Sequence, residues 1–293
     1  MNVETINQSK ISPDRLISFA ETLVYKFKPM QIYLFSKIVK TNTEEGCFTP
    51  KVNREKVHYF LMMIMEGPTR NEHEVQDFCR VKFGYGKITI LSHSLETVQE
   101  SARKNNRFFI SILNNGKPLY DHTGFVKPKD NLPFDPSQNL EKAERHYSHR
   151  IRLAQGFLDG AENSYGSGHY SVAVFMVHQV IEQCTIGLIR VNLGYRSDIH
   201  NLGRQLDLCQ CFSAKPSEIF RTSNEDLRLF EILLRSYSQA RYKDNFKIDQ
   251  EDADKLVTKA YAFFELTKKI CMDKIEQFKA ENALLKEREV SFE

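Results

Sequence analysis

The spacing of apolar residues changes once along this chain, and that change divides the chain in two. Residues 1–127 mix short apolar runs with helical patterns, whereas residues 140–293 follow helical spacing throughout. Residues 128–139 contain three prolines among polar residues, a composition typical of a linker. A chain of 293 residues is long enough for two domains. We therefore expect an α+β protein, with a small α/β sheet domain followed by an all-α domain.

Composition excludes several classes of protein. The apolar fraction is 41%, the charged fraction 27% and the net charge +3, so any basic binding site has to be local. Residues 1–10 have no apolar signal core, and the most apolar run, residues 172–191, is interrupted by polar residues. Six scattered cysteines without a Cys-x-x-Cys pair are typical of reduced thiols. The sequence predicts a cytoplasmic protein with no membrane span.

In the first domain, strand and helix patterns alternate. Three short apolar runs are predicted strands: 32–39, 57–65 and 87–91. Three segments are predicted helices: 12–28, 71–82 and one that begins at Ser94. We expect a polar loop at residues 41–54 and a short helix or extended piece at 107–113. This alternation favours a small α/β sheet.

The second domain contains five helical patterns. The first covers 147–165 and is followed by a tight connection at 165–168. The second covers 170–192 and the third 202–211. The fourth begins at Ser223 or Asn224, and the fifth runs from about 250 to beyond 278. The second helix is apolar nearly all round, so we expect it at the centre, closed by Gly194. On the fourth helix the predicted buried face consists of Leu227, Phe230, Leu234 and Tyr237.

The end of the fourth helix is the most informative local segment. Four residues beyond Tyr237 the apolar face reaches Arg241, beside Tyr242 and Lys243. A guanidinium group there needs an anion, and its planar donors fit phosphate oxygens while a phenol ring can stack on a base. Two other interpretations stay open: Arg241 pairs internally with a residue such as Glu182, or it is exposed.

Two histidine-containing pairs lie one helical turn apart. His178 and Glu182 occur on the apolar central helix, and His146 and His149 on the helix before it. Two ligands are too few for a metal site, and buried polar pairs usually satisfy each other. The sequence therefore predicts no metal site and no cofactor.

Three blocks of the second half carry a family resemblance. They are GHYSVAVFMVHQVIE at 168–182, GYRSDIHNL at 194–202 and YSQARYKD at 237–244. In order and spacing they resemble HEPN domains (higher eukaryotes and prokaryotes nucleotide-binding) over residues 138–286. The resemblance implies an up-and-down five-helix bundle that often dimerises. Some members of the family bind nucleotides, and others are metal-independent ribonucleases.

The resemblance also suggests a site. It implies that polar residues line a cleft beside the central helices, and the predicted phosphate-binding set is Arg241, Tyr242, Lys243, Tyr237, His200, Glu182, His178 and Arg235. The ribonuclease branch needs an arginine and a histidine separated by four to six residues. Arg196 and His200 have only three residues between them, so they do not fit this spacing. No arginine–histidine pair in the sequence does. We therefore predict no catalytic residue and favour a non-enzymatic protein.

The N-terminal half resembles a degenerate nucleotidyltransferase domain, which precedes the HEPN bundle in many bacterial relatives. Residues 31–37 sit where the family has a strand running into Gly-Ser, but Phe35 replaces the glycine. Residues 57–65 sit where a strand carries Asp-x-Asp, but no acid precedes Glu66. Phosphoryl transfer of this kind needs paired carboxylates to hold Mg²⁺. The resemblance therefore implies an inactive module.

The sequence as a whole favours a non-catalytic HEPN protein that binds a nucleotide or nucleic-acid phosphate. We expect a homodimer through the HEPN helices and a nucleotide or RNA as ligand. Three alternatives remain: a divergent HEPN ribonuclease, a nucleotidyltransferase of the toxin–antitoxin type, and a purely structural dimer.

Overall fold

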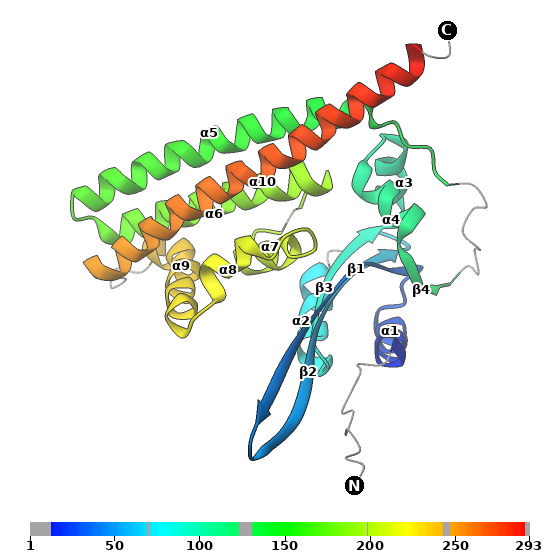
Figure 1. Ribbon diagram of the computed structural model, residues 1–293, viewed down its shortest axis with the longest axis horizontal. Helices are drawn as coiled ribbons and strands as arrows, with labels where there is room; N and C mark the ends of the chain where they lie inside the picture. The colour runs from blue at the N-terminus through cyan, green and yellow to red at the C-terminus, as the bar shows by residue number, and fades with distance from the viewer. Residues whose placement is uncertain (1–12, 69–70, 123–130, 198, 243–246, 291–293) are drawn as a thin grey trace. The chain divides into compact units, whose positions relative to one another are not determined.

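The protein folds into a sheet unit and a helical unit. The structure, a computed structural model, describes residues 13–68, 71–122, 131–197, 199–242 and 247–290. Its internal contacts divide the chain into unit 1, Met1–Phe134, and unit 2, Asp135–Glu293. Unit 1 is a mixed sheet with helices and unit 2 is a bundle of helices (Figure 1), so the predicted α+β class is confirmed.

Unit 1 is built on a four-stranded sheet. Its elements are α1 (Pro13–Phe27), β1 (Gln31–Gly46), β2 (Thr49–Met65), α2 (Glu72–Lys82), β3 (Lys87–Ser94), α3 (Leu95–Arg103), α4 (Arg107–Asn115) and β4 (Lys117–Asp121). The strand order is β3-β2-β1-β4, in which β2 and β3 are parallel and the other neighbours antiparallel. The helix expected from Ser94 is present, because the Ser94 hydroxyl accepts the Thr97 backbone N–H at 3.1 Å.

One face of this sheet packs against α1 and α2. Alternate residues of a strand point to opposite faces, and the set with Leu61 and Met63 points to this side. Leu23 of α1 and Val75 of α2 complete the cluster, and all four side chains are fully buried. The amphipathic spacing of the two helices therefore explains why they cover this face.

The other face carries aromatic side chains. Phe60 of β2 lies 6.0 Å, between ring centroids, from Phe35 of β1, and Phe35 lies 5.7 Å from Phe108 of α4. Phe35 stands at a register shift between Leu34 and Ser36, which is a β-bulge in β1. Where the resemblance placed a strand ending in Gly-Ser, the chain thus continues as a bulged strand.

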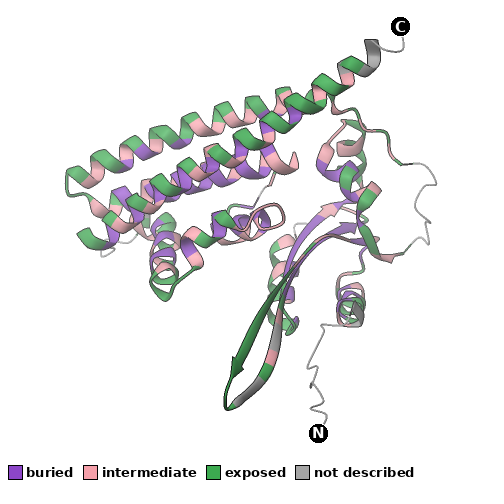
Figure 2. Ribbon diagram, in the orientation of Figure 1, coloured by how far each residue is buried: buried purple, intermediate pink, exposed green. Residues whose placement is uncertain are grey.

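The loop expected at residues 41–54 is wrong. β1 continues to Gly46 and turns directly into β2, with pairs from Val39–Val57 through Glu44–Val52. We call residues 37–46 and 49–56 the ribbon; its described side chains are nearly all exposed (Figure 2). Antiparallel pairing satisfies the backbone without any core. The two strands therefore form without an apolar face. Their sequence shows no apolar alternation, so it did not predict strands here.

Unit 2 is arranged around one apolar helix. Its elements are a 3₁₀ turn η1 (Pro136–Gln138), α5 (Asn139–Gly166), α6 (Tyr170–Leu193), α7 (Leu202–Cys209), α8 (Lys215–Arg221), α9 (Asn224–Tyr242) and α10 (Gln250–Val290). Buried residues concentrate on α6, which α5, α7, α9 and α10 contact (Figure 2). Gly194 ends it in the left-handed conformation at φ 72°, as predicted.

The expectation of five helices is short by one in the described part of unit 2. The segment around Pro216, taken as a turn, forms α8, with Pro216 in its first turn. Proline lacks an N–H, but the first turn of a helix needs none there. Phe220 of α8 is fully buried and packs against the rings of Phe230 and Phe263, so α8 contributes to the core.

Helix α6 is also the one described helix that is long and apolar enough to cross a membrane. Its most apolar stretch of 18 residues has a mean hydropathy of 1.6. However, 67% of that stretch is buried inside the bundle. The central helix of a packed bundle meets the same criteria, and the burial accounts for the composition.

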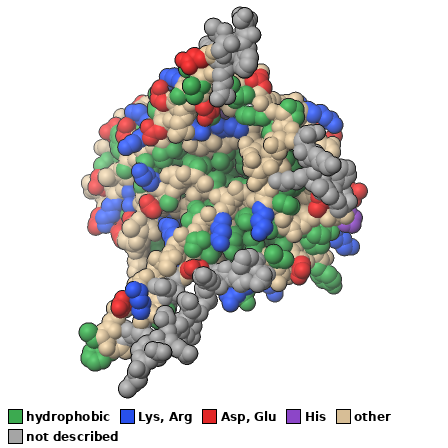
Figure 3. All heavy atoms as spheres, turned by 45° about the vertical axis from the view of Figure 1, so that its right-hand side comes forward, with side chains coloured by type: hydrophobic (Ala, Val, Ile, Leu, Met, Phe, Trp, Pro, Cys, Tyr) green, Lys and Arg blue, Asp and Glu red, His purple; other side chains and the backbone are tan. Residues whose placement is uncertain are grey.

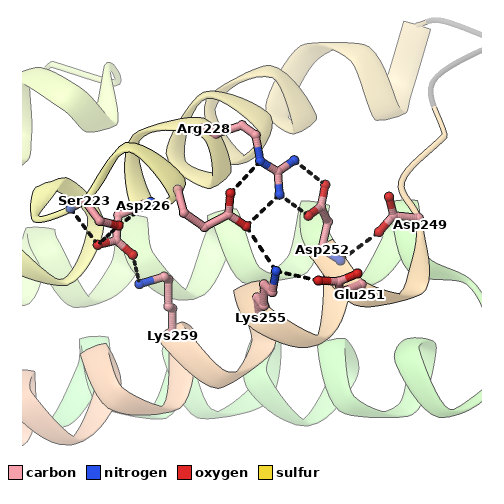
Figure 4. Close-up of polar contacts among 9 residues, drawn as sticks. Ser223, Asp226, Arg228, Asp249, Glu251, Asp252, Lys255 and Lys259 are labelled. Atoms are coloured by element: carbon pink, nitrogen blue, oxygen red, sulfur yellow. Dashed lines mark hydrogen bonds and ion pairs between the residues drawn. The ribbon is translucent and has the colours of Figure 1, made fainter.

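An ion network joins the starts of α9 and α10 (Figure 4). Arg228 pairs with Glu225 and with Asp252, and its Nη1 donates to Asp252 Oδ2 at 2.8 Å. Lys255 bridges Glu225 at 3.1 Å and Glu251 at 2.7 Å. Both helices begin with acidic residues, which complement the helix dipoles. The cations between the helices then hold the two starts together.

Candidate functional site

Two of the predicted site residues are buried on α6. The exposed fraction is 3% for His178 and 7% for Glu182. The His178 ring packs on Tyr237 of α9, with centroids 4.9 Å apart, and Gln179 Nε2 lies 3.4 Å from His178 Nδ1. His178 is therefore part of the contact between α6 and α9.

Glu182 faces a histidine from the segment between α6 and α7. His200 Nδ1 lies 3.6 Å from Glu182 Oε1. The Glu182 side chain is 10% exposed and the His200 side chain 81%. The structure thus brings four predicted residues together around α6: His178, Glu182, His200 and Tyr237.

The buried face predicted for α9 is right only in part. Phe230 is buried, but Leu227 is 47% exposed and Tyr237 37%. Leu229, Leu233 and Ser236 are buried as well. Ser236 is fully buried because its hydroxyl donates to the Leu233 carbonyl at 2.7 Å, which satisfies the polar group within the helix. A buried serine gave no apolar signal, so the predicted stripe was rotated around the helix.

The end of α9 holds the remaining predicted residues. Arg235 and Tyr242 are exposed, Tyr242 to 76%. The side chain of Arg241 and the whole of Lys243 lie outside the described residues. A phosphate-binding role for this segment stays a prediction.

Arg150, on α5, lies among the polar residues of α6. Arg150 Nη1 donates to Gln183 Oε1 at 2.5 Å. The Arg150 Nε is buried, and among the described residues it has no hydrogen-bond partner. A Cβ at Gly187 would come within 3.3 Å of the Arg150 Cβ, so the glycine allows this close approach. Arg150 therefore keeps a buried donor unsatisfied, which is costly unless a ligand or water fills it.

His146 stands one turn earlier on α5, beside a third arginine. Arg190 Nη1 of α6 lies 3.4 Å from His146 Nδ1. Burial lowers the pKa of His146 to about 4, with further lowering by Arg190, Arg145 and Arg150. His146 is therefore neutral near pH 7, because burial and the neighbouring guanidinium groups both disfavour its charged form.

These residues form one locally basic group. We call it the α5–α6 cluster, and its members are His146, Arg150, Glu182, Gln183, Arg190 and Arg196. Burial lowers the pKa of the Arg150 guanidinium, Glu182 opposes that shift, and Arg196 adds to it. Three guanidinium groups outweigh one carboxylate, so the α5–α6 cluster favours an anion.

One face of the molecule is mixed in charge. On the face drawn in Figure 3, Lys and Arg side chains are interspersed with Asp and Glu. The net charge is only +3. An anion site on this protein therefore has to come from local arrangement.

Other chemistry finds little support in the residues that the structure describes. No group of three or more His, Cys, Asp or Glu side chains there could hold a metal ion. Burial raises the pKa of the Cys184 thiol to about 12 and that of Cys209 well above its ordinary value. Such thiols are protonated and unreactive, as expected of the core.

Sequence reasoning missed the arginines of the α5–α6 cluster. Arg150 and Arg190 fall on helix faces with no motif around them, and their proximity depends on how α5 packs on α6. One signal was available. Gly187, in the middle of an apolar helix, marks a close approach of another element.

Comparisons with known proteins address the second unit. Residues 147–270 match the family described as HEPN domain. The crystal structure of an archaeal HEPN homologue matches with a TM-score of 0.32 and 20% identity, over 43% of this chain and 97% of that one. None of the curated proteins is significantly similar to the chain.

The family assignment rests on the sequence match over 147–270. Nothing in these comparisons identifies unit 1 as a nucleotidyltransferase, so that resemblance stays a prediction. The matched region begins within α5 and ends within α10, and it includes every residue of the α5–α6 cluster except His146. Residues 147–270 of this chain are therefore a HEPN domain.

Proposed function

We propose that the HEPN unit binds a phosphate group of a nucleotide or of a nucleic acid at the α5–α6 cluster, without cleaving it. The observation that carries the proposal is the buried Arg150 Nε without a hydrogen-bond partner among the described residues, in a surrounding of further guanidinium groups. Arginine is the residue best suited to phosphate oxygens, because its donors lie in a planar fork.

Two exposed features extend this site outward. Arg196 influences Arg150 electrostatically and is itself exposed, so a ligand can reach it from solvent. Tyr237 packs against His178 and keeps 37% of its surface exposed, which suits contact with a base. The ligand that fits these groups is a phosphate attached to a nucleoside.

The same geometry argues against ribonuclease chemistry. A general acid–base works best when its pKa lies near the working pH. The pKa of His146 is about 4, and the Arg-x4–6-His spacing of the ribonuclease branch is absent from the sequence. Binding is thus better supported than cleavage.

Isothermal titration with ATP, GTP and a short single-stranded RNA tests the proposal. We expect binding to weaken at least about tenfold in Arg196→Gln, which removes a charged phosphate contact. Arg150→Lys keeps the charge but loses the planar fork, and it is expected to weaken binding as well. Arg152→Gln, on the exposed side of α5, is the matched control and should leave affinity unchanged.

Arg241→Ala separates this site from the one predicted at the end of α9. If Arg241→Ala loses affinity and Arg196→Gln does not, the binding site lies at the end of α9. Release of cut RNA, with or without Mg²⁺, would show that the protein cleaves RNA and would contradict the proposal. The homodimer and the cytoplasmic location stay predictions, and light scattering on the purified chain tests the first.

A further inference from the structure

Glu182 is a carboxylate buried on α6. Its side chain is 10% exposed, and His200 Nδ1 lies 3.6 Å from its Oε1, which is too far for a hydrogen bond. Among the residues that the structure describes, no other donor reaches the Glu182 oxygens. Burial removes water from a carboxylate and is costly unless hydrogen bonds replace that water. Glu182 therefore keeps the capacity to accept a hydrogen bond from a ligand.

Arg150 attracts Glu182, but its Nη1 donates elsewhere. The Glu182 charge works to raise the pKa of the Arg150 guanidinium, so the two groups lie near each other. In the described part of the chain, however, Arg150 Nη1 donates to Gln183 Oε1, and Arg150 Nε stays buried without a partner. Both groups thus keep unused hydrogen-bonding capacity. A ligand that carries an anionic group and a hydroxyl donor would satisfy both of them.

The order of contacts along α6 matches the order of groups in a nucleotide. His178 packs against Tyr237, the ring proposed to contact a base. Glu182 follows one turn later, about 6 Å further along the axis. Gly187, about 7 Å further again, is where Arg150 of α5 comes close to α6. A carboxylate between the base contact and the phosphate contact lies where the sugar belongs.

The chemistry of the sugar decides which nucleotide fits. An ionised carboxylate only accepts hydrogen bonds, so it needs a donor such as a hydroxyl group. Carboxylates bind the ribose 2′-hydroxyl in dinucleotide-binding folds, and this hydroxyl distinguishes RNA from DNA at a protein site. We infer that Glu182 accepts a hydrogen bond from the 2′-hydroxyl, so that the site selects ribonucleotides over deoxyribonucleotides. The inference rests on the phosphate site proposed above.

Gln205 of α7 holds the segment at the entrance to this carboxylate. It is 1% exposed, and its Nε2 donates to the Ile199 carbonyl at 2.5 Å. Its Oε1 is buried and has no hydrogen-bond partner among the described residues. Ile199 precedes His200, whose side chain is 81% exposed and faces Glu182. Gln205 is therefore a positioning residue that fixes His200 at the solvent side of the carboxylate.

A purely structural role for Glu182 makes a different prediction. If Glu182 only balances the charge of Arg150, its removal should tighten the binding of every phosphate ligand by the same factor. If Glu182 binds the 2′-hydroxyl, its removal should cost affinity for ribonucleotides alone. The ratio of the affinities for ATP and 2′-deoxy-ATP separates the two roles.

Isothermal titration of the full chain with ATP and 2′-deoxy-ATP measures this ratio. We expect the wild type to bind ATP about tenfold or more tightly, because the deoxy ligand leaves a buried carboxylate unpaired. Glu182→Met removes the acceptor and should bring the ratio close to one. Glu182→Gln keeps an acceptor oxygen without the charge and should retain part of the preference. Glu231→Gln, which changes an exposed carboxylate of α9, is the matched control and should keep the wild-type ratio.

Two oligonucleotides of one sequence show where the ribose comes from. Tighter binding of single-stranded RNA than of DNA, lost in Glu182→Met, would place the 2′-hydroxyl in an RNA chain. A preference seen with ATP alone would place it in a free nucleotide. Equal affinity of the wild type for ATP and 2′-deoxy-ATP would overturn the inference and leave the phosphate site standing, as would an unchanged ratio in a folded Glu182→Met. No binding of any of these ligands would overturn both.

Discussion

Helix α6 and the ribbon satisfy the same backbone requirement in opposite surroundings. Both are held by backbone hydrogen bonds, α6 within itself and the ribbon between its two strands, although the outward-facing N–H and C=O groups of the ribbon are left to water. The side chains of α6 are mostly buried, and those described on the ribbon are nearly all exposed. The comparison teaches that backbone pairing builds both elements, whereas only α6 gains the stability that apolar burial provides.

The largest expected difference concerns aromatic truncation. Phe263 is fully buried against Phe220, so Phe263→Ala should lower the free energy of unfolding by about 3–5 kcal/mol. Phe48→Ala at the ribbon tip should change it by less than about 0.5 kcal/mol, because no packing is lost. Urea unfolding measures both, and equal losses would break the comparison.

Ion pairs should differ in the same direction. Asp252 is 8% exposed and accepts two hydrogen bonds from Arg228, so Asp252→Asn should cost about 1–2 kcal/mol, discounted for the half-exposed arginine. On the ribbon, Glu45 lies 3.5 Å from Lys51 with both side chains largely exposed. Glu45→Gln should cost less than about 0.5 kcal/mol.

The pH dependence of the unfolding free energy tests the Asp252–Arg228 pair further. Arg228 lowers the pKa of Glu225 to about 2, with help from Lys255, and lowers that of Asp252. A carboxyl whose pKa is depressed by folding stabilises above its unfolded value near ~4, and that contribution is lost as pH falls toward 2. Unfolding curves between pH 6 and 2 should therefore fall less steeply for Asp252→Asn than for the wild type.

Backbone conformation gives a smaller effect. Gly194 has φ 72°, a region unfavourable for residues with a Cβ, so Gly194→Ala should destabilise by about 1 kcal/mol. Gly84 has open space around it and no positive φ, and Gly84→Ala should be near neutral. A neutral result at Gly194 would show that the end of α6 rearranges without cost.

The smallest effect is a titration. The pKa of His146 is about 4, and Arg190→Gln should raise it toward its ordinary value, as measured by NMR of the ring protons. Because the folded state binds the proton less well than the unfolded state, His146 makes stability fall as pH drops from about 6.5 to 4. An unchanged pKa in the variant would mean that burial and the other cationic neighbours set it without Arg190.

Several features of the fold were predictable because they have local causes. The helix start at Ser94, the αL glycine after α6 and the central position of α6 follow from caps and periodicity. The ribbon was not predictable in the same way, since exposed strands carry no apolar alternation. The orientation of α9 was missed because buried Ser236 interrupts the apolar stripe.

The sequence by itself determined the two-part organisation, the α+β class and the HEPN resemblance of the second half. These depend on spacing along the chain, which periodicity and motif order report directly. The tertiary structure alone decided which arginines meet. Arg150, Arg190 and Arg196 come from different segments, and their shared field exists only once α5 packs on α6. Electrostatic energy depends on distance in space, and helix packing sets that distance.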